Sequence, residues 1–299
     1  MTADANEAYD EYALLLDAVR GIRWPARAVV RGGMSGAHTS RLRGISAEFT
    51  EYRPYRQGDD PRRVDWKLFA RSNRAYIRLS NDRAILPTMV VLDASASMAF
   101  PVATSGKWKL AAQIGVALGA VARSSGDPVG LVIAKGDDSV LLPPRTRGTV
   151  IHEIIGAVST TAPGGSEPLA PTVSIAAQSA GRIVIATDLL GDSAELLTVA
   201  GRLVAAGREV YVIHVIAGEE LEPSPDSMMV TDPEAADVRR ALTGATRDAY
   251  LNAFGEWRER IAHDCADTGI AYFTAVVGDE TTDHLARRIA APRGVAATA

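Results

Sequence analysis

The chain has 299 residues, of which 47% are hydrophobic and 23% charged, an ordinary composition for a globular protein of one large or two modest domains. Its one cysteine, Cys265, excludes an internal disulfide and a cysteine-based metal site. A polar start and apolar runs too short to cross a bilayer predict a cytoplasmic protein, bound to a membrane at most peripherally through a partner.

The net charge of −4 is unevenly distributed along the chain. Residues 20–83 hold 15 basic and six acidic side chains, a net charge of +9, whereas residues 184–299 hold 10 basic and 19 acidic ones, a net charge of −9. Two surfaces with different partners, or two parts that attract each other, would explain this asymmetry.

Residues 1–87 are expected to form an N-terminal segment packed on or beside a larger sheet domain. The stretch from Glu48 to Trp66 is dense in charged and aromatic residues, and its Pro and Gly residues predict turns rather than regular structure. Elsewhere in the segment, periodicity predicts two helices (Tyr9–Val19 and Val64–Ala70) and two strands (Arg27–Val30 and Tyr76–Leu79).

Residues 88–299 alternate between apolar strands and helices, which predicts an α/β fold: a doubly wound, mostly parallel six-stranded sheet of Rossmann type, covered on both faces. The second and third strands are joined by a hairpin-like turn, so the third is expected to be an antiparallel edge. Residues 219–245 read as an acidic insertion of loop with a small hairpin. The expected strands are Met89–Leu92, Val129–Ala134, Val140–Leu142, Ile183–Ala186, Val210–Ile216 and Ala271–Ala275. The expected helices are Lys107–Ser124, Val150–Ser159, Leu169–Ala180, Ser193–Ala206, Thr246–Thr268 and Thr281–Ile289.

Oxygen-bearing side chains follow the first strand of this sheet at every second position: Asp93, Ser95 and Ser97. Ligands of open α/β sheets bind at the carboxyl ends of the strands, and a hard cation such as Mg²⁺ prefers oxygen ligands. Two further oxygens are expected at the same edge, from Ser166 after a Gly-Gly turn and from Asp188 after the fourth strand. The sequence therefore predicts a five-residue cation site; the alternative is that Ser95 and Ser97 only cap a turn and a helix.

This pattern of Asp-x-Ser-x-Ser, a later hydroxyl and a later Asp resembles the metal-ion-dependent adhesion site of von Willebrand factor A domains. The resemblance covers Thr88 to Pro292. It implies a von Willebrand factor A-like fold that holds Mg²⁺, or Mn²⁺ or Ca²⁺, with one coordination position left for a carboxylate of the partner. Ser166 stands where that family usually has Thr, and both side chains offer a hydroxyl.

The stretch from Glu48 to Arg71 resembles the hallmark of a bacterial family known as domain of unknown function 58. Gly36–Gly44, Thr231–Glu234 and Gly269–Tyr272 match that family too, so the resemblance covers nearly the whole chain. The family is commonly encoded beside MoxR-type AAA+ ATPases. The resemblance implies an adaptor or chaperone component that works with such an ATPase and matures or inserts metals in client proteins.

The leading interpretation is a non-enzymatic, metal-dependent protein-interaction module whose partner is a MoxR-type ATPase or a client with an acidic side chain. The arginines of the N-terminal signature are expected to pin that segment internally, to dock a partner, or to do both. A metal-dependent phosphoester hydrolase is the alternative, although no His or Lys motif lies at the predicted strand ends. Nucleic-acid binding through the basic segment is a further alternative, disfavoured by the acids interleaved with its arginines. The candidate docking residues are Arg53, Arg56, Arg62, Arg63 and Arg71.

Overall fold

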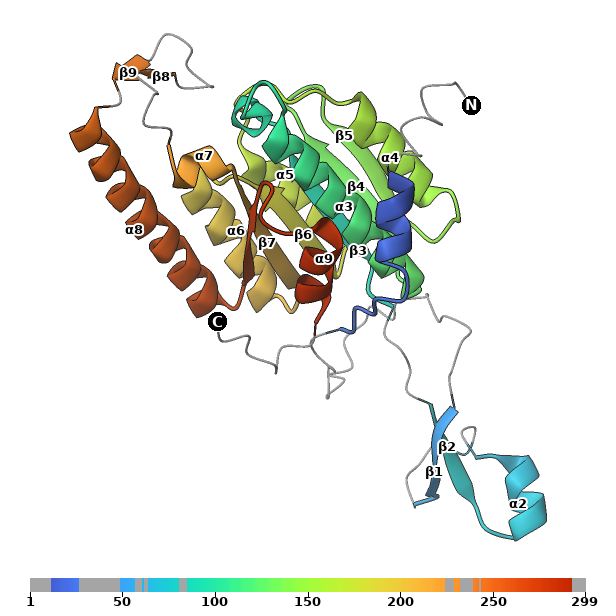
Figure 1. The fold of residues 1–299 in the computed structure, drawn as a ribbon. Helices are drawn as coiled ribbons and strands as arrows, with labels where there is room; N and C mark the ends of the chain where they lie inside the picture. The colour runs from blue at the N-terminus through green and yellow to red at the C-terminus, as the bar shows by residue number, and fades with distance from the viewer. Residues whose placement is uncertain are drawn as a thin grey trace. The chain divides into compact units, whose positions relative to one another are not determined.

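The computed structural model describes residues 12–26, 49–56, 61, 64–80, 85–223, 229–231, 239–241 and 243–291 (Figure 1). The chain forms two compact units: residues 28–85 are one, and the residues before and after them make up the other. The expected strand Arg27–Val30 and the motif Gly36–Gly44 lie outside the described residues.

The larger unit is built on a six-stranded sheet with the order β10-β7-β6-β3-β4-β5. All neighbouring pairs are parallel except β4 and β5, which are antiparallel. The predicted α/β class, the six strands and the antiparallel edge are thereby confirmed. The strands are β3 (Thr88–Asp93), β4 (Val129–Ala134), β5 (Val140–Arg145), β6 (Arg182–Thr187), β7 (Glu209–Ile216) and β10 (Ala271–Val276).

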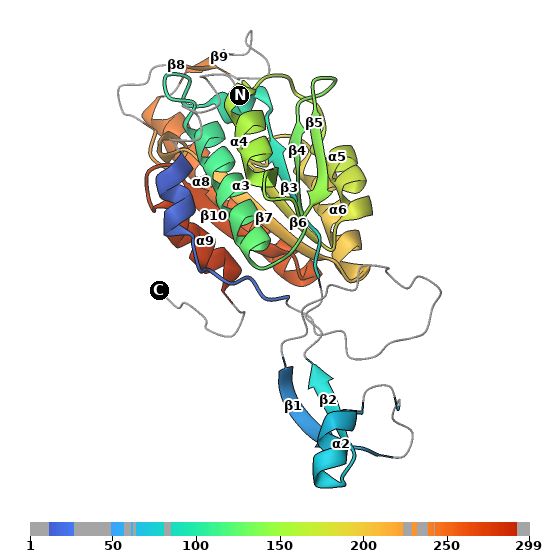
Figure 2. The same ribbon diagram turned by 90° about the vertical axis from the view of Figure 1, so that its right-hand side faces the viewer.

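Helices cover both faces of this sheet, as Figures 1 and 2 show. Alternate residues of β3 enter two separate cores: Val90 and Leu92 pack on one face, Met89 and Val91 on the other. A central strand buried on both faces has to be apolar throughout, which is why its sequence is a continuous apolar run. One face carries α3 (Gly106–Ser124), α4 (Val150–Thr160) and α9 (Thr282–Ala290); the other carries α5 (Leu169–Ala176), η3 (Ala177–Ser179), α6 (Ser193–Ala205) and α8 (Gly244–Thr268).

Residues 12–18, the described part of the first expected helix, are helical and belong to the core of the sheet unit. Residues 1–87 were expected to form one N-terminal segment, but the structure divides them. Residues 12–26 pack with the sheet, and residues 28–85 form the other unit. Tyr12, Val19 and Trp24 supply the apolar contacts, because each is at most 7% exposed.

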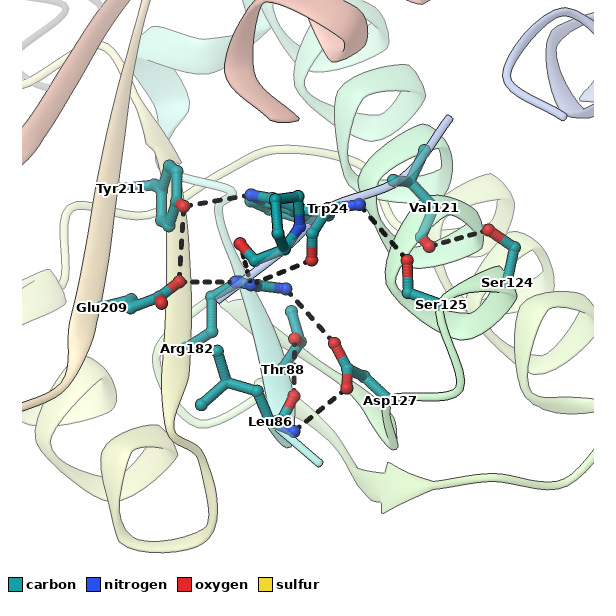
Figure 3. A network of polar contacts seen from close by, with 11 residues as sticks. Trp24, Leu86, Thr88, Val121, Ser124, Ser125, Asp127, Arg182, Glu209 and Tyr211 are labelled. Atoms are coloured by element: carbon teal, nitrogen blue, oxygen red, sulfur yellow. Dashed lines mark hydrogen bonds and ion pairs between the residues drawn. The ribbon is translucent and has the colours of Figure 1, made fainter. Parts of the chain in front are cut away.

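A buried ion-pair network holds both chain segments that lead into residues 28–85 (Figure 3). The Arg182 guanidinium pairs with Asp127 at 3.3 Å and with Glu209 at 2.9 Å, and it lies 4.2 Å from the ring centre of Trp24. Arg182 also donates to the Trp24 carbonyl at 3.4 Å, in the segment that precedes residues 28–85. Asp127 accepts from the Leu86 amide at 3.0 Å, in the segment that follows them. One ion pair therefore fixes the chain on either side of the smaller unit.

The smaller unit pairs β1 (Phe49–Pro54) antiparallel with β2 (Tyr76–Ser80) and contains α2 (Trp66–Ser72). β2 and α2 confirm the expected strand and helix. β1 was not predicted, because Pro54 and the charged residues around it indicated turns; in the structure Pro54 ends the strand instead of preventing it. Asp65 caps α2 through the amides of Lys67 and Leu68.

In the acidic insertion, β8 (Met229–Thr231) and β9 (Arg239–Ala241) form the expected small hairpin. A short helix, α7 (Gly218–Leu221), precedes them and was not predicted. None of the helices in the described part of the chain is both long and apolar enough to span a membrane.

Candidate functional site

The loop after β3 gathers three of the predicted ligands. Asp93 is the last residue of β3, and its Oδ1 accepts a hydrogen bond from the Ser95 amide at 2.9 Å. The chain then enters a 3-10 turn, η2 (Ala96–Ala99), which brings the hydroxyl oxygens of Ser95 and Ser97 to 3.1 Å from each other. The Asp-x-Ser-x-Ser spacing thus folds into a compact group of oxygens at the carboxyl end of a central strand.

The glycine loop before α5 is hydrogen-bonded to this group. The Gly164 amide donates to the Ala94 carbonyl at 2.7 Å, and the Ala96 amide donates to the Gly165 carbonyl at 2.8 Å. Gly165 has a φ of 86°, a backbone conformation that residues with a side chain rarely adopt. These contacts place Ser166 in the same pocket as Asp93 and Ser95.

The loop after β6 completes the site from the neighbouring strand. The Thr187 hydroxyl donates to Asp93 Oδ2 at 2.6 Å, so both oxygens of Asp93 accept hydrogen bonds. β3 is followed by α3 on one face of the sheet and β6 by α6 on the other. The site therefore lies at a switch point of the sheet, where open α/β folds bind their ligands.

Asp188 has a partner that the sequence did not reveal. Its Oδ2 lies 2.8 Å from Nζ of Lys107, the second residue of α3, and its Oδ1 accepts from the Leu190 amide at 3.2 Å. The same Lys107 ammonium lies 2.8 Å from Glu220 on α7. The role of Asp188 as a metal ligand stays a prediction, and the structure adds an internal cation beside it.

These charges shift the pKa values of the site. Burial raises the pKa of Asp93, and the negative charge of Asp188 raises it further. Burial opposes the charge of Lys107, but Asp188 and Glu220 outweigh it and raise the Lys107 pKa. Burial lowers the pKa of the neighbouring His214 to about 4, so that the imidazole is neutral at neutral pH, with Nδ1 2.7 Å from the Tyr272 hydroxyl.

The group as a whole is deficient in positive charge. Asp93, Asp188 and Glu220 are three carboxyl groups, and Lys107, which pairs with Asp188 and Glu220, is the one ammonium among the described residues that pairs with any of them, so acidic groups outnumber the cation. A divalent cation at Asp93 would balance this excess and would reverse the upward shift of the Asp93 pKa.

The donor geometry fits a small cation bound by hydroxyls. Adjacent ligands of an octahedral Mg²⁺ with bonds of about 2.1 Å lie roughly 3.0 Å apart, close to the 3.1 Å between Ser95 Oγ and Ser97 Oγ. No three His, Cys, Asp or Glu side chains of the described chain are grouped as a metal site. A site here would depend on the serine hydroxyls and on water as well as on Asp93.

An open pocket of about 200 Å³ adjoins these oxygens. Of the residues discussed above, Asp93, Ser95, Ser166 and Thr187 line it, whereas Ser97 and Asp188 are buried and do not. Thr187 follows directly from its place at a strand end and could have been predicted. Lys107 and Glu220 could not, because Lys107 lies 81 positions from Asp188 and 113 positions from Glu220.

The candidate docking arginines belong to the smaller unit. The structure shows Arg56 and Arg71 exposed and Arg53 half-buried, and Arg62 and Arg63 lie outside the described residues. The docking role of these arginines stays a prediction.

Comparison with known families decides the affiliation of the chain. Residues 51–260 match the family described as "Protein of unknown function DUF58". The chain belongs to this family. The DUF58 match begins in β1 of the smaller unit and ends within α8 of the larger one, so it covers parts of both units and every predicted ligand.

Relatives of this DUF58 chain include the uncharacterized proteins Mb1516 of Mycobacterium bovis and Rv1480 of Mycobacterium tuberculosis. Each is 28% identical over 263 residues, which cover 85% of this chain and 82% of the relative. Among solved structures, the conserved hypothetical protein BatB from Bacteroides thetaiotaomicron is 18% identical with a TM-score of 0.47, over 68% of this chain and 97% of BatB. The SpRpn10 VWA domain is 11% identical with a TM-score of 0.38, over 67% of this chain and 94% of that domain.

Proposed function

We propose that this chain is a non-enzymatic module that binds a partner protein through a divalent cation. Asp93, Ser95, Ser97, Ser166 and Asp188 would hold the ion, which would be Mg²⁺, Mn²⁺ or Ca²⁺. The observation that carries the proposal is the convergence of Asp93, Ser95 and Ser97 at a strand end, where Asp93, Ser95 and Ser166 line an open pocket. When bound, the cation would supply an electrophilic position for an acidic side chain of the partner.

The chain's own residues would prepare that position. The Thr187 hydroxyl and the Ser95 amide hold the two oxygens of Asp93 in fixed directions. Lys107 neutralises part of the charge of Asp188 and Glu220, so the fold tolerates three nearby carboxylates before the ion arrives. We propose a MoxR-type AAA+ ATPase or its client as the partner, on the strength of the family resemblance, with Arg53, Arg56, Arg62, Arg63 and Arg71 as a second contact.

Two observations favour binding over phosphoester hydrolysis. A pocket of about 200 Å³ is smaller than the roughly 300–1,000 Å³ typical of small-molecule sites. Hydrolysis of a phosphoester also needs a positive clamp on the phosphate, and none of the described residues that line the pocket is Lys, Arg or His.

Thermal unfolding with increasing Mg²⁺ or Mn²⁺ tests the metal site. A ligand that binds only the native state at about 100 times its Kd stabilises that state by about 2.7 kcal/mol, so the midpoint is expected to rise by several degrees. Asp93→Asn should abolish the rise. Asp192→Asn, at the rim of the same pocket, is the matched control and should retain it. An unchanged midpoint in the wild type, or an equal rise in Asp93→Asn, would refute the site.

Capture of the ATPase tests the partner. The purified MoxR-type ATPase encoded nearest to this chain should be retained by the immobilised wild type in Mg²⁺, and both EDTA and Asp93→Asn should release it. Equal retention in Mg²⁺ and in EDTA would contradict a metal-bridged contact. Hydrolysis of a phosphoester panel that disappears in Asp188→Ala would favour the enzymatic alternative instead.

A further inference from the structure

The pocket beside the candidate cation site has an apolar part as well as a polar one. Leu169, Leu189 and Leu196 line it together with Pro168, from the start of α5, the loop after β6 and the first turn of α6. Leu189 and Leu196 are 2% and 3% exposed, so they belong to a packed wall rather than to a loose surface. The polar part of the pocket includes Asp93, Ser95 and Ser166 of the candidate site. A ligand held there would touch both surfaces.

The size of the pocket limits what can enter it. Its volume is about 200 Å³. That space suits an aliphatic side chain and is smaller than the roughly 300–1,000 Å³ typical of sites for drug-sized molecules. The wall of three leucines favours a side chain without polar atoms.

The rim of the pocket adds a charge preference. Glu167 and Asp192 line it with exposed carboxylates, and Asp192 also accepts a hydrogen bond from the Glu195 amide at the start of α6. Neither carboxylate forms an ion pair with another of the described residues. Both repel a second acidic side chain of the partner, so a run of acidic residues fits this surface less well than a single one.

Resting on the proposed function, we propose that the partner segment carries an aliphatic side chain directly beside its metal-binding Asp or Glu, and that this aliphatic side chain occupies the pocket. The acidic residue supplies the contact to the cation. The aliphatic residue supplies selectivity, because it buries against Leu189 and Leu196 where a polar residue would leave its hydrogen-bonding groups without partners.

Blocked tetrapeptides with the full chain test this proposal. The peptides are Gly-Asp-Leu-Gly, Gly-Asp-Ser-Gly and Gly-Asn-Leu-Gly at millimolar concentration. With Mn²⁺ on the protein, the paramagnetic ion broadens the proton resonances of any peptide that binds beside it. Gly-Asp-Leu-Gly is expected to bind about tenfold more tightly than Gly-Asp-Ser-Gly, and Gly-Asn-Leu-Gly should show no specific broadening.

A pair of Phe substitutions, one inside the pocket and one beside it, tests whether the pocket is needed. Ser193 lines the pocket and Ala194, the next residue of α6, is exposed and does not. Ser193→Phe should remove the preference for the Leu peptide while leaving the metal-induced rise in unfolding midpoint, and Ala194→Phe should change neither. If Ser193→Phe does not fold, the comparison of the three peptides on the wild type decides alone.

The outcomes separate the two proposals. Suppose first that Mg²⁺ stabilises the wild type. If the wild type then binds the Leu and Ser peptides equally, or does not bind the Leu peptide, the pocket proposal is overturned and the metal-dependent binding function stands. A wild type that neither Mg²⁺ nor Mn²⁺ stabilises would overturn the proposed function and the pocket proposal with it.

Discussion

Lys107 is a buried ammonium that ties three elements together. It is 1% exposed and pairs with Asp188, on the loop after β6, and with Glu220, on α7. In Lys107→Met the buried Asp188 and the partly buried Glu220 lose their counter-charge, so the free energy of unfolding should fall by about 3–5 kcal/mol. Urea denaturation measures the loss.

Lys109→Met is the matched control for Lys107, because the same substitution two residues along α3 falls at an exposed position. Its effect should stay within about 0.5 kcal/mol. A similar small loss in both variants would show that the buried lysine is not needed to compensate Asp188 and Glu220.

At the scale of single residues, the sequence predicted the members of the site better than their contacts. Asp93, Ser95 and Ser97 are close in the chain, so their spacing alone brought them together. Ser166 could be predicted because its loop precedes α5, and α5 leads into β6, the strand that neighbours β3. The pairing of Asp188 with Lys107 joins residues 81 positions apart. The sequence alone does not distinguish a buried lysine from an exposed one, so this pair could not be predicted.

Arg182 anchors two chain segments to the base of β6. Its guanidinium pairs with Asp127 and Glu209, and its side chain is fully buried. In Arg182→Met both carboxylates lose their cation, and the free energy of unfolding should fall by about 3–5 kcal/mol. Hydrogen exchange should accelerate most at the amides of Trp24 and Leu86, which the network holds on either side of the smaller unit.

Arg202→Met on the exposed face of α6 is the matched control for Arg182 and should leave exchange at both amides unchanged. Unaltered exchange at Trp24 and Leu86 in Arg182→Met would contradict the anchoring role of the network.

At the scale of helices and strands, apolar runs predicted every strand of the sheet, most clearly the central strands β3, β4, β6 and β7, because strands buried on both faces must be apolar throughout. Arg182 marks the limit of that rule: the expected strand began at Ile183, yet β6 starts with a charged residue that the Asp127 and Glu209 carboxylates neutralise. β1 was missed for a related reason. Its charged residues and Pro54 are not typical of a strand. β1 is stabilised by pairing with β2, which lies more than 20 positions later in the chain.

For the whole molecule, the order of the strands in the sheet determines where the pocket lies. β3 lies between β4 and β6, so the loops after β3 and β6 leave the same edge toward opposite faces and open a pocket between them. Periodicity alone does not specify that order. The smaller unit is inserted between two segments that the Arg182 network fixes, so a partner contact through its arginines and one through the cation site belong to different units of the chain.

The most direct test of the account is a crystal of the full chain soaked in Mn²⁺ and measured at the manganese absorption edge. The account predicts an anomalous peak within about 2.2 Å of oxygens from Asp93, Ser95 and Ser97, and its loss in crystals of Asp93→Asn. A crystal with no peak at these residues, or a peak that survives in Asp93→Asn, would contradict the central claim that this strand end holds a divalent cation.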